Sequence, residues 1–196
     1  MRILVATKNP GKAKEIGMFL GTDFEVSSLK DLSDAPDIEE TGNTFEENAI
    51  LKAKAYFKWS GIPCVADDAG LEIDFLNGGE PGVKSRRWLG YEMTDQEMID
   101  TALAKLQGIP WEKRTTRLIA VGAYYDGKNL IIERGSTEGF ITEEQRIKCE
   151  PGYPFRSIFW IPRFKKLYQE LTHEEHEQIN HRRELYSKLA EKIKSL

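Results

Sequence analysis

Two adjacent carboxylates, Asp67 and Asp68, follow a short apolar segment of this 196-residue chain. Residues 62–66 are typical of a buried strand, which places both acids at its C-terminal end, the edge that faces the ligand crevice in α/β sheets. Successive side chains of an extended segment point to opposite sides, so we expect only one acid to enter a site. Beside phosphates, such a carboxylate usually binds Mg²⁺. A solvated turn is the alternative interpretation.

A second candidate occupies residues 7–12, between a short apolar strand and a helix expected over residues 12–20. Backbone N–H groups and the positive end of a helix dipole make such a connection suitable for phosphate. Thr7 and Asn9 offer neutral hydrogen bonds, and Lys12 offers a charge. The GxxxxGK[ST] pattern of a Walker A loop is absent, and a capped turn with surface lysines is the alternative.

Three charged segments are further candidates, and for each of them a solvated surface is the alternative. The pair Glu39-Glu40 lies in an acidic loop and offers a second metal ligand. Another pair, Arg86-Arg87, follows a glycine-rich loop, and His181-Arg182-Arg183 lies in the last helix that we expect. Because an arginine fork can bind a carbonyl oxygen or a phosphate, both basic segments suit a nucleotide.

Apolar spacing and turn residues predict the elements that must position these groups. Strands are expected over residues 2–6, 24–28 and 62–66, with a hairpin of 118–125 and 130–133 that 140–141 extends. Helices are expected over residues 12–20, 44–59 and 94–106, and from about 173 to the C-terminus. This pattern predicts one α/β domain over residues 1–196, with two lobes and a small-molecule cleft between them.

Composition narrows the classes of function. The net charge of -4 disfavours a nucleic-acid polymer as partner, since gripping that backbone requires concentrated Lys and Arg. Two isolated cysteines and three histidines disfavour a zinc site or a disulfide framework. The sequence lacks an apolar run of membrane-spanning length and a signal peptide. We therefore expect a cytoplasmic protein that does not act on a membrane.

Taken in order, these segments resemble the inosine triphosphatase family, the dITP/XTP pyrophosphatases that act on non-standard purine nucleotides. The family's T-x-N-x-x-K motif matches residues 7–12, and its E-E-T-G-x-T-F-x-E-N-A-x-x-K-A motif matches residues 39–53. Its D-D-S-G-L motif is similar to residues 67–71, and its G-x-P-G-V-x-S-A-R loop is similar to residues 79–87. The resemblance covers essentially the whole chain.

The resemblance implies an elongated α/β fold with a central mixed sheet flanked by helices, and a homodimer. It implies hydrolysis of a nucleoside triphosphate to the monophosphate and pyrophosphate, with Mg²⁺ held by Glu39 and Asp68. Asp68 is then the general base, and Lys12 is the second catalytic residue. The implied substrate-binding residues are Thr7, Lys8, Asn9, Lys12, Lys52, Ala69, Ser85, Arg86, Arg87, Tyr153, Phe155, Arg156, His176, Asn180, His181 and Arg182.

Departures from the family concentrate in the part that reads the base. The family's G-F-G-[YW]-D-P-x-F segment aligns with residues 152–159, where Arg156 replaces the Asp. In the family's K-N-x-x-S-H-R segment, His176 replaces the Lys and Asn180 replaces the Ser; Ala69 replaces the Ser after the paired acids. Since a carboxylate accepts hydrogen bonds and a guanidinium only donates them, we expect an altered base preference. ITP, dITP and XTP remain the default substrates.

Two other functions stay open at this point. One is a catalytically silent nucleotide-binding protein, which the rewritten base-reading segment would allow. The other is a diphosphohydrolase that uses the same metal centre on a modified or non-nucleotide substrate. Retention of Lys12, Glu39 and Asp68 favours the pyrophosphatase over the silent protein.

Overall fold

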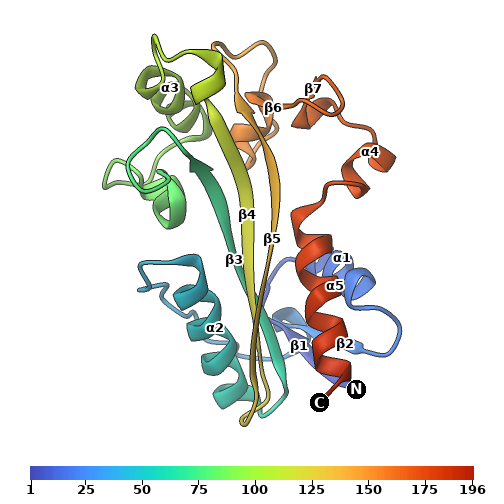
Figure 1. Cartoon of the computed structure of the whole chain (residues 1–196). Helices are drawn as coiled ribbons and strands as arrows, with labels where there is room; N and C mark the ends of the chain where they lie inside the picture. Colours follow the sequence, from blue (N-terminus) through green and yellow to red (C-terminus); the bar gives the residue numbers. More distant parts are fainter. The chain divides into compact units, whose positions relative to one another are not determined.

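A computed structural model describes all 196 residues, and its central element is a seven-stranded mixed sheet in the order β2-β1-β3-β4-β5-β6-β7 (Figure 1). The chain divides into two compact units. The first unit comprises residues 1–69, 120–135 and 181–196, and the second comprises residues 70–119 and 136–180. Strands β3 (Cys64–Ile73), β4 (Thr115–Tyr125) and β5 (Leu130–Ile141) contribute residues to both units. The sheet and its flanking helices confirm the predicted α/β class, whereas the cleft stays a prediction.

The first unit starts from β1 (Arg2–Val5), which pairs in parallel with both β2 (Glu25–Ser28) and β3. Its helices are α1 (Pro10–Leu20), α2 (Phe45–Ser60) and α5 (His181–Lys194). Apolar residues of α1, β1 and α5 form one core cluster, which contains Ile3, Val5, Ile16, Leu20, Leu185, Tyr186, Leu189 and Ile193. The Thr44 hydroxyl accepts a hydrogen bond from the Glu47 N–H and caps α2, as the spacing of these two residues predicts.

The second unit contains β6 (Phe159–Ile161), β7 (Lys166–Leu167), α3 (Asp95–Lys105) and α4 (His173–Glu177). Strands β5, β6 and β7 pair antiparallel here. The core is built around α3, and it contains Leu71, Ile73, Trp88, Met98, Ile99, Ala102 and Phe155. Arg114 is 2% exposed, and its guanidinium donates to four backbone carbonyls, those of Leu106, Ile109, Ile141 and Thr142. A buried charge with this many acceptors is structural.

Three predicted boundaries were wrong. Strand β3 continues to Ile73, because Leu71 and Ile73 are buried in the second core, so the paired acids lie within the strand and not at its end. Strand β5 is one continuous element and not two pieces. The last helix is two helices, α4 and α5, because the Thr137 hydroxyl binds the Ile179 carbonyl between them. None of the helices combines the length and the apolar composition needed to cross a bilayer.

Candidate active site

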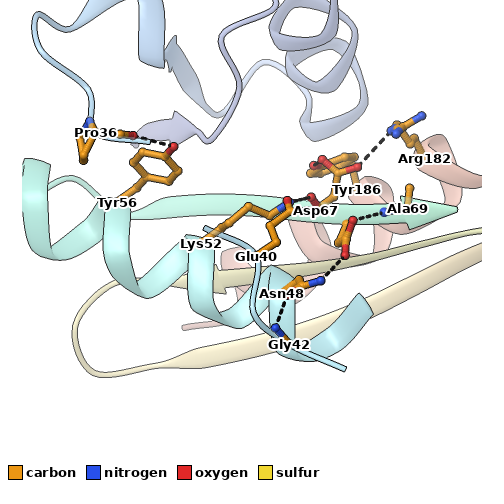
Figure 2. A network of polar contacts seen from close by, with 11 residues as sticks. Pro36, Glu40, Gly42, Asn48, Lys52, Tyr56, Asp67, Ala69, Arg182 and Tyr186 are labelled. Atoms are coloured by element: carbon orange, nitrogen blue, oxygen red, sulfur yellow. Dashed lines mark hydrogen bonds and ion pairs between the residues drawn. The ribbon is translucent and has the colours of Figure 1, made fainter. Parts of the chain in front are cut away.

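The carboxylates of Asp67 and Asp68 bind different partners, in accordance with the alternation of side chains along β3 (Figure 2). Asp67 accepts hydrogen bonds from Arg182 Nε (3.1 Å) and from the Tyr186 hydroxyl (3.0 Å), both on α5. Asp68 accepts from Asn48 Nδ2 (2.8 Å) and from the N–H of Ala69 (2.9 Å). Both acids are therefore held by specific contacts, which argues against the solvated turn.

Helix α2 supplies two of the groups that surround the paired acids. Asn48 and Lys52 lie one turn apart and therefore on the same face of the helix. Asn48 is 3% exposed, and its side-chain oxygen accepts the N–H of Gly42 at 2.8 Å while its nitrogen holds Asp68. Lys52 Nζ donates to the Asp67 carbonyl (2.7 Å) and to Glu40 Oε1 (2.5 Å). The helix thus binds the acidic loop to β3.

Three cations gather around the carboxylate of Asp67. Burial works to raise the pKa of Asp67, but the charges of Arg182, Lys52 and Lys12 hold it below its ordinary value. Burial lowers the pKa of Lys12, and the positive charges of Arg182 and Lys52 lower it further. These cations also face the carboxylates of Glu15 and Glu40, so the first unit brings together the basic groups that suit phosphate oxygens and the acidic groups that suit a metal ion.

The environment of Asp68 differs from that of its neighbour. Burial raises the pKa of Asp68, and the charge of Glu40 adds to the rise, while the Asn48 hydrogen bond and the Lys52 charge oppose it. A carboxylate with a raised pKa accepts a proton more readily than an ordinary one does. Asp68 is therefore the better candidate for a general base, and Asp67 is the better candidate for a structural anchor.

The loop before α1 is a helix cap. The Asn9 side-chain oxygen accepts from the N–H groups of Gly11 (2.9 Å) and Lys12 (3.3 Å), and the Thr7 hydroxyl accepts the Asn9 N–H (3.1 Å). Lys8 pairs with Asp37 at 2.5 Å on the exposed surface. These contacts confirm the alternative interpretation of the loop as a capped turn. Roles for Thr7, Lys8 and Asn9 in binding phosphate stay predictions.

The two acids of the 39–40 pair differ in their contacts. Both acids are exposed, but Glu40 bonds Lys52 and acts electrostatically on Asp68. No group of three or more His, Cys, Asp or Glu side chains has a metal-binding arrangement. A cation here would need oxygen atoms from its substrate or from water to complete its coordination, as is usual for Mg²⁺.

In the second unit, Arg156 lies on an aromatic surface. Its guanidinium carbon is 3.8 Å from the centre of the Tyr153 ring, and its Nη1 donates to Glu150 Oε2 at 3.1 Å. The neighbouring Tyr168 hydroxyl is 2.6 Å from His176 Nε2. Charged and planar groups are therefore placed together at the positions that depart from the family pattern.

The remaining predicted residues of the second unit have mainly structural contacts. Arg86 pairs with Asp95 (2.5 Å), whose other oxygen accepts the Gly152 N–H (2.7 Å). The Ser85 hydroxyl donates to the Gly82 carbonyl, and Arg87 is exposed. Phe155 belongs to the core of this unit, and Asn180 is also buried. Their roles in binding substrate stay predictions.

Sequence reasoning missed two residues of the first unit, Asn48 and Tyr186, and it did not predict the partners of Glu40 and Asp67. Both missed residues carried a usable signal. Asn48 is a polar residue that directly precedes the apolar face of α2, beginning at Ala49, and Tyr186 lies four residues after Arg182, one helical turn away. The contact of α5 with β3 joins segments more than 110 residues apart, so only the fold reveals it.

Comparison with known proteins agrees with this arrangement, since the Ham1 family model matches residues 3–192. The chain belongs to the Ham1 family. Among its Ham1 relatives, the dITP/XTP pyrophosphatase of Bacillus cereus is 42% identical over 98% of this chain and 94% of its own length. The Bacillus subtilis dITP/XTP pyrophosphatase is 40% identical over 98% and 96% of the two chains.

Solved Ham1 structures have the same fold. The Staphylococcus aureus Ham1 protein superimposes with a TM-score of 0.87 at 32% identity, over 100% of this chain and 99% of that one. A Ham1 protein from Coxiella burnetii gives 0.87 at 34% identity over the whole of both chains. The similarity thus extends over both units of this Ham1 protein.

Proposed function

We propose that this Ham1 protein is a nucleoside triphosphate pyrophosphatase, which hydrolyses a (d)NTP to the (d)NMP and pyrophosphate. The observation that carries the proposal is the grouping of Lys12, Lys52 and Arg182 around Asp67, next to Asp68, a partly buried carboxylate that Asn48 holds by a hydrogen bond. The names of its relatives point to a non-standard purine nucleotide, such as dITP or XTP, as the substrate.

The proposed reaction assigns tasks to several of these side chains. The cations Lys12 and Lys52 bind phosphate oxygens and reduce the charge that repels a nucleophile. Asp68 accepts the proton of a water molecule as its oxygen bonds to the α-phosphorus. The bond between that phosphorus and the bridging oxygen breaks, and pyrophosphate leaves with the electron pair. Asn48 keeps Asp68 in a fixed orientation throughout.

We propose that the reaction requires a divalent cation, Mg²⁺, bound by Asp68 and one acid of the 39–40 pair. The donor set fits such an ion, since it consists of carboxylate oxygens and the charge of Glu40 raises the pKa of Asp68. The sequence resemblance implies Glu39 as the second ligand, whereas the electrostatic effect of Glu40 on Asp68 favours Glu40. When bound, the cation would neutralise charge on the phosphates and polarise the phosphorus.

We also propose that the base preference differs from that of the relatives, and that the whole chain, 1–196, acts as one catalytic domain. Arg156 on Tyr153 supports an altered preference, because a guanidinium offers donors to a base edge that carries acceptors. The resemblance to the family leads us to propose a homodimer that works in the cytoplasm, which light scattering and cell fractionation would test.

The direct test of the proposed function is release of pyrophosphate from a panel of ribo- and deoxynucleoside triphosphates with Mg²⁺ present. Asp68→Asn serves as the blank. Release by the natural protein and none by the variant would support the proposal. Nucleotide binding without any product would instead indicate a silent binding protein.

A further inference from the structure

The segment 150–156, which includes the departure at Arg156, forms two successive turns in the second unit. The Tyr153 N–H donates to the Glu150 carbonyl at 2.9 Å, and the Arg156 N–H donates to the Tyr153 carbonyl at 3.2 Å. Gly152 has a φ of 85°, which favours glycine over residues with a side chain. Tyr153 is 37% exposed, and the Arg156 guanidinium carbon lies 3.8 Å from the centre of its ring. The two side chains thus present an open planar surface.

A planar surface of this kind suits a nucleotide base, but it does not by itself distinguish one base from another. Every base can stack on an aromatic ring, because every base has a π-face. Discrimination therefore depends on hydrogen bonds, which the Arg156 guanidinium can donate only to acceptors in the right place. The direction of this guanidinium depends in turn on how firmly the backbone at Gly152 is held.

Helix α3 holds the turn at Gly152 through the carboxylate of Asp95. Asp95 is the first residue of α3, and its Oδ2 accepts the Gly152 N–H at 2.7 Å. The helix is itself fixed, since its Met98 and Ile99 pack in the core cluster that also contains Phe155. Segment 150–156 is thus attached to the α3 side of this unit by apolar packing at Phe155 and by a hydrogen bond at Gly152.

The other oxygen of Asp95 is bound by Arg86. The Nη2 of Arg86 donates to Asp95 Oδ1 at 2.5 Å, and its Nη1 donates to the Met93 carbonyl at 3.3 Å. Burial works to raise the pKa of Asp95, but the Gly152 N–H and Arg86 hold it below its ordinary value, so the carboxylate stays charged at neutral pH. In the family's G-x-P-G-V-x-S-A-R loop, Ala stands at the position of Arg86. Two departures from the family, at residues 86 and 156, are therefore connected through one carboxylate.

We propose that Arg86 and Asp95 are positioning residues, which hold the turn at Gly152 so that Tyr153 and Arg156 meet the base of the nucleotide in a fixed arrangement. This inference rests on the proposed function, since it concerns how the base of the substrate is distinguished. Arg86 acts only through Asp95 and does not touch the substrate. Removing its guanidinium leaves the turn in place but less restricted, so discrimination between bases weakens while binding of the phosphates does not change.

The test measures how well the protein distinguishes bases when it binds nucleotides without turnover. Dissociation constants for ITP, XTP, GTP and ATP are measured by calorimetry in EDTA, with inorganic triphosphate as a base-free reference. We expect Arg86→Ala to reduce the ratio between the weakest and the tightest nucleotide about five- to tenfold, the range of one hydrogen bond. The dissociation constant of inorganic triphosphate should stay as it is in the natural protein.

Lys105→Ala is the matched control. Lys105 lies at the other end of α3 from Asp95 and pairs with Glu80 at 3.0 Å, and 37% of its side chain is exposed, against 40% for Arg86. This variant also loses an ion pair of the second unit, but the pair lies away from the turn at Gly152. Its nucleotide ratio and its affinity for inorganic triphosphate should both equal those of the natural protein.

A double-mutant cycle shows whether the effect passes through Asp95. Asp95→Asn removes the charge that Arg86 binds, so Arg86→Ala should have little further effect on the ratio in that background. Additive effects would overturn the inference, as would an Arg86→Ala protein that keeps the natural ratio or also loses affinity for inorganic triphosphate. Equal binding of all four nucleotides by the natural protein would overturn it too. Because the binding measurement needs no turnover, failure of pyrophosphate release would reject the proposed function without deciding this point.

Discussion

Asn48 Nδ2 donates to Asp68 Oδ2 at 2.8 Å, and this contact joins a buried helical amide to the proposed general base. The amide oxygen is itself fixed by the N–H of Gly42, so the amide has one orientation. We therefore expect Asn48→Ala to lower kcat by about 10- to 100-fold, the usual loss when the support of a reacting group is removed, with little change in KM. Steady-state kinetics would measure this.

The control is Asn129→Ala, which removes an amide that donates to Asp126 at 2.9 Å in the hairpin turn. This variant should keep the natural kcat. An Asn48→Ala protein that is folded and fully active would show that Asp68 needs no such support.

Replacing Asp68, the proposed general base, should abolish activity while it raises the stability of the folded protein. Burial raises the pKa of Asp68 above its ordinary value of 3.8, so the folded protein binds this proton more tightly than the unfolded chain does. The stability that this proton contributes is complete below the unfolded-state pKa and is lost as the pH rises through the folded-state pKa. At neutral pH the ionised carboxylate is thus destabilising.

We expect Asp68→Asn to abolish turnover and to raise the Tm of the metal-free protein at pH 7 by a few degrees, since 1 kcal/mol corresponds to about 2–4 °C in a chain of this size. The gain should shrink at lower pH, where Asp68 becomes protonated. Differential scanning calorimetry at several pH values measures this, and a Tm that falls at pH 7 would contradict the assigned environment.

In the natural enzyme, the same raised pKa of Asp68 predicts that activity declines as the pH falls and this base is protonated.

The acidic loop provides a matched pair for locating the second metal ligand. If Glu40 is the ligand, Glu40→Gln should raise the Mg²⁺ concentration needed for half-maximal activity by about tenfold or more, because a carboxylate oxygen is a stronger Mg²⁺ ligand than an amide. Glu39→Gln should then behave as the natural protein does. If instead Glu39→Gln raises the required Mg²⁺ concentration and Glu40→Gln does not, Glu39 is the second metal ligand.

Arg156 is the position at which a change of charge should alter substrate choice. We expect Arg156→Asp to change the ratio of kcat/KM values between bases by about tenfold or more, because a mismatched hydrogen-bonding group at a base is strongly rejected. Arg163→Asp is the control, since Arg163 also lies over an aromatic ring, that of Phe164, with its guanidinium carbon 5.2 Å from the ring centre. Equal base ratios in all three proteins would remove Arg156 from base recognition.

The sequence predicted the α/β class and the alternation of the paired acids because both depend on local patterns of apolar and polar residues. It did not predict the length of β3, since the pattern Asp67-Asp68-Ala69-Gly70 is typical of a turn and its extended form depends on Leu71 and Ile73 packing in a distant core. The contact of Tyr186 with Asp67 was equally hidden, because the apolar neighbours of Tyr186 on α5 make it look like an ordinary core residue. Such contacts arise only when remote segments meet.

Pyrophosphate release, measured with Mg²⁺ over dITP, ITP, XTP and the four standard (d)NTPs, tests the central claim most directly. We predict pyrophosphate and the nucleoside monophosphate as the products, in equal amounts and with no orthophosphate, and no turnover by Asp68→Asn. Absence of product with every nucleotide would contradict the account, as would release of orthophosphate, which would mean that the γ-phosphorus and not the α-phosphorus is attacked.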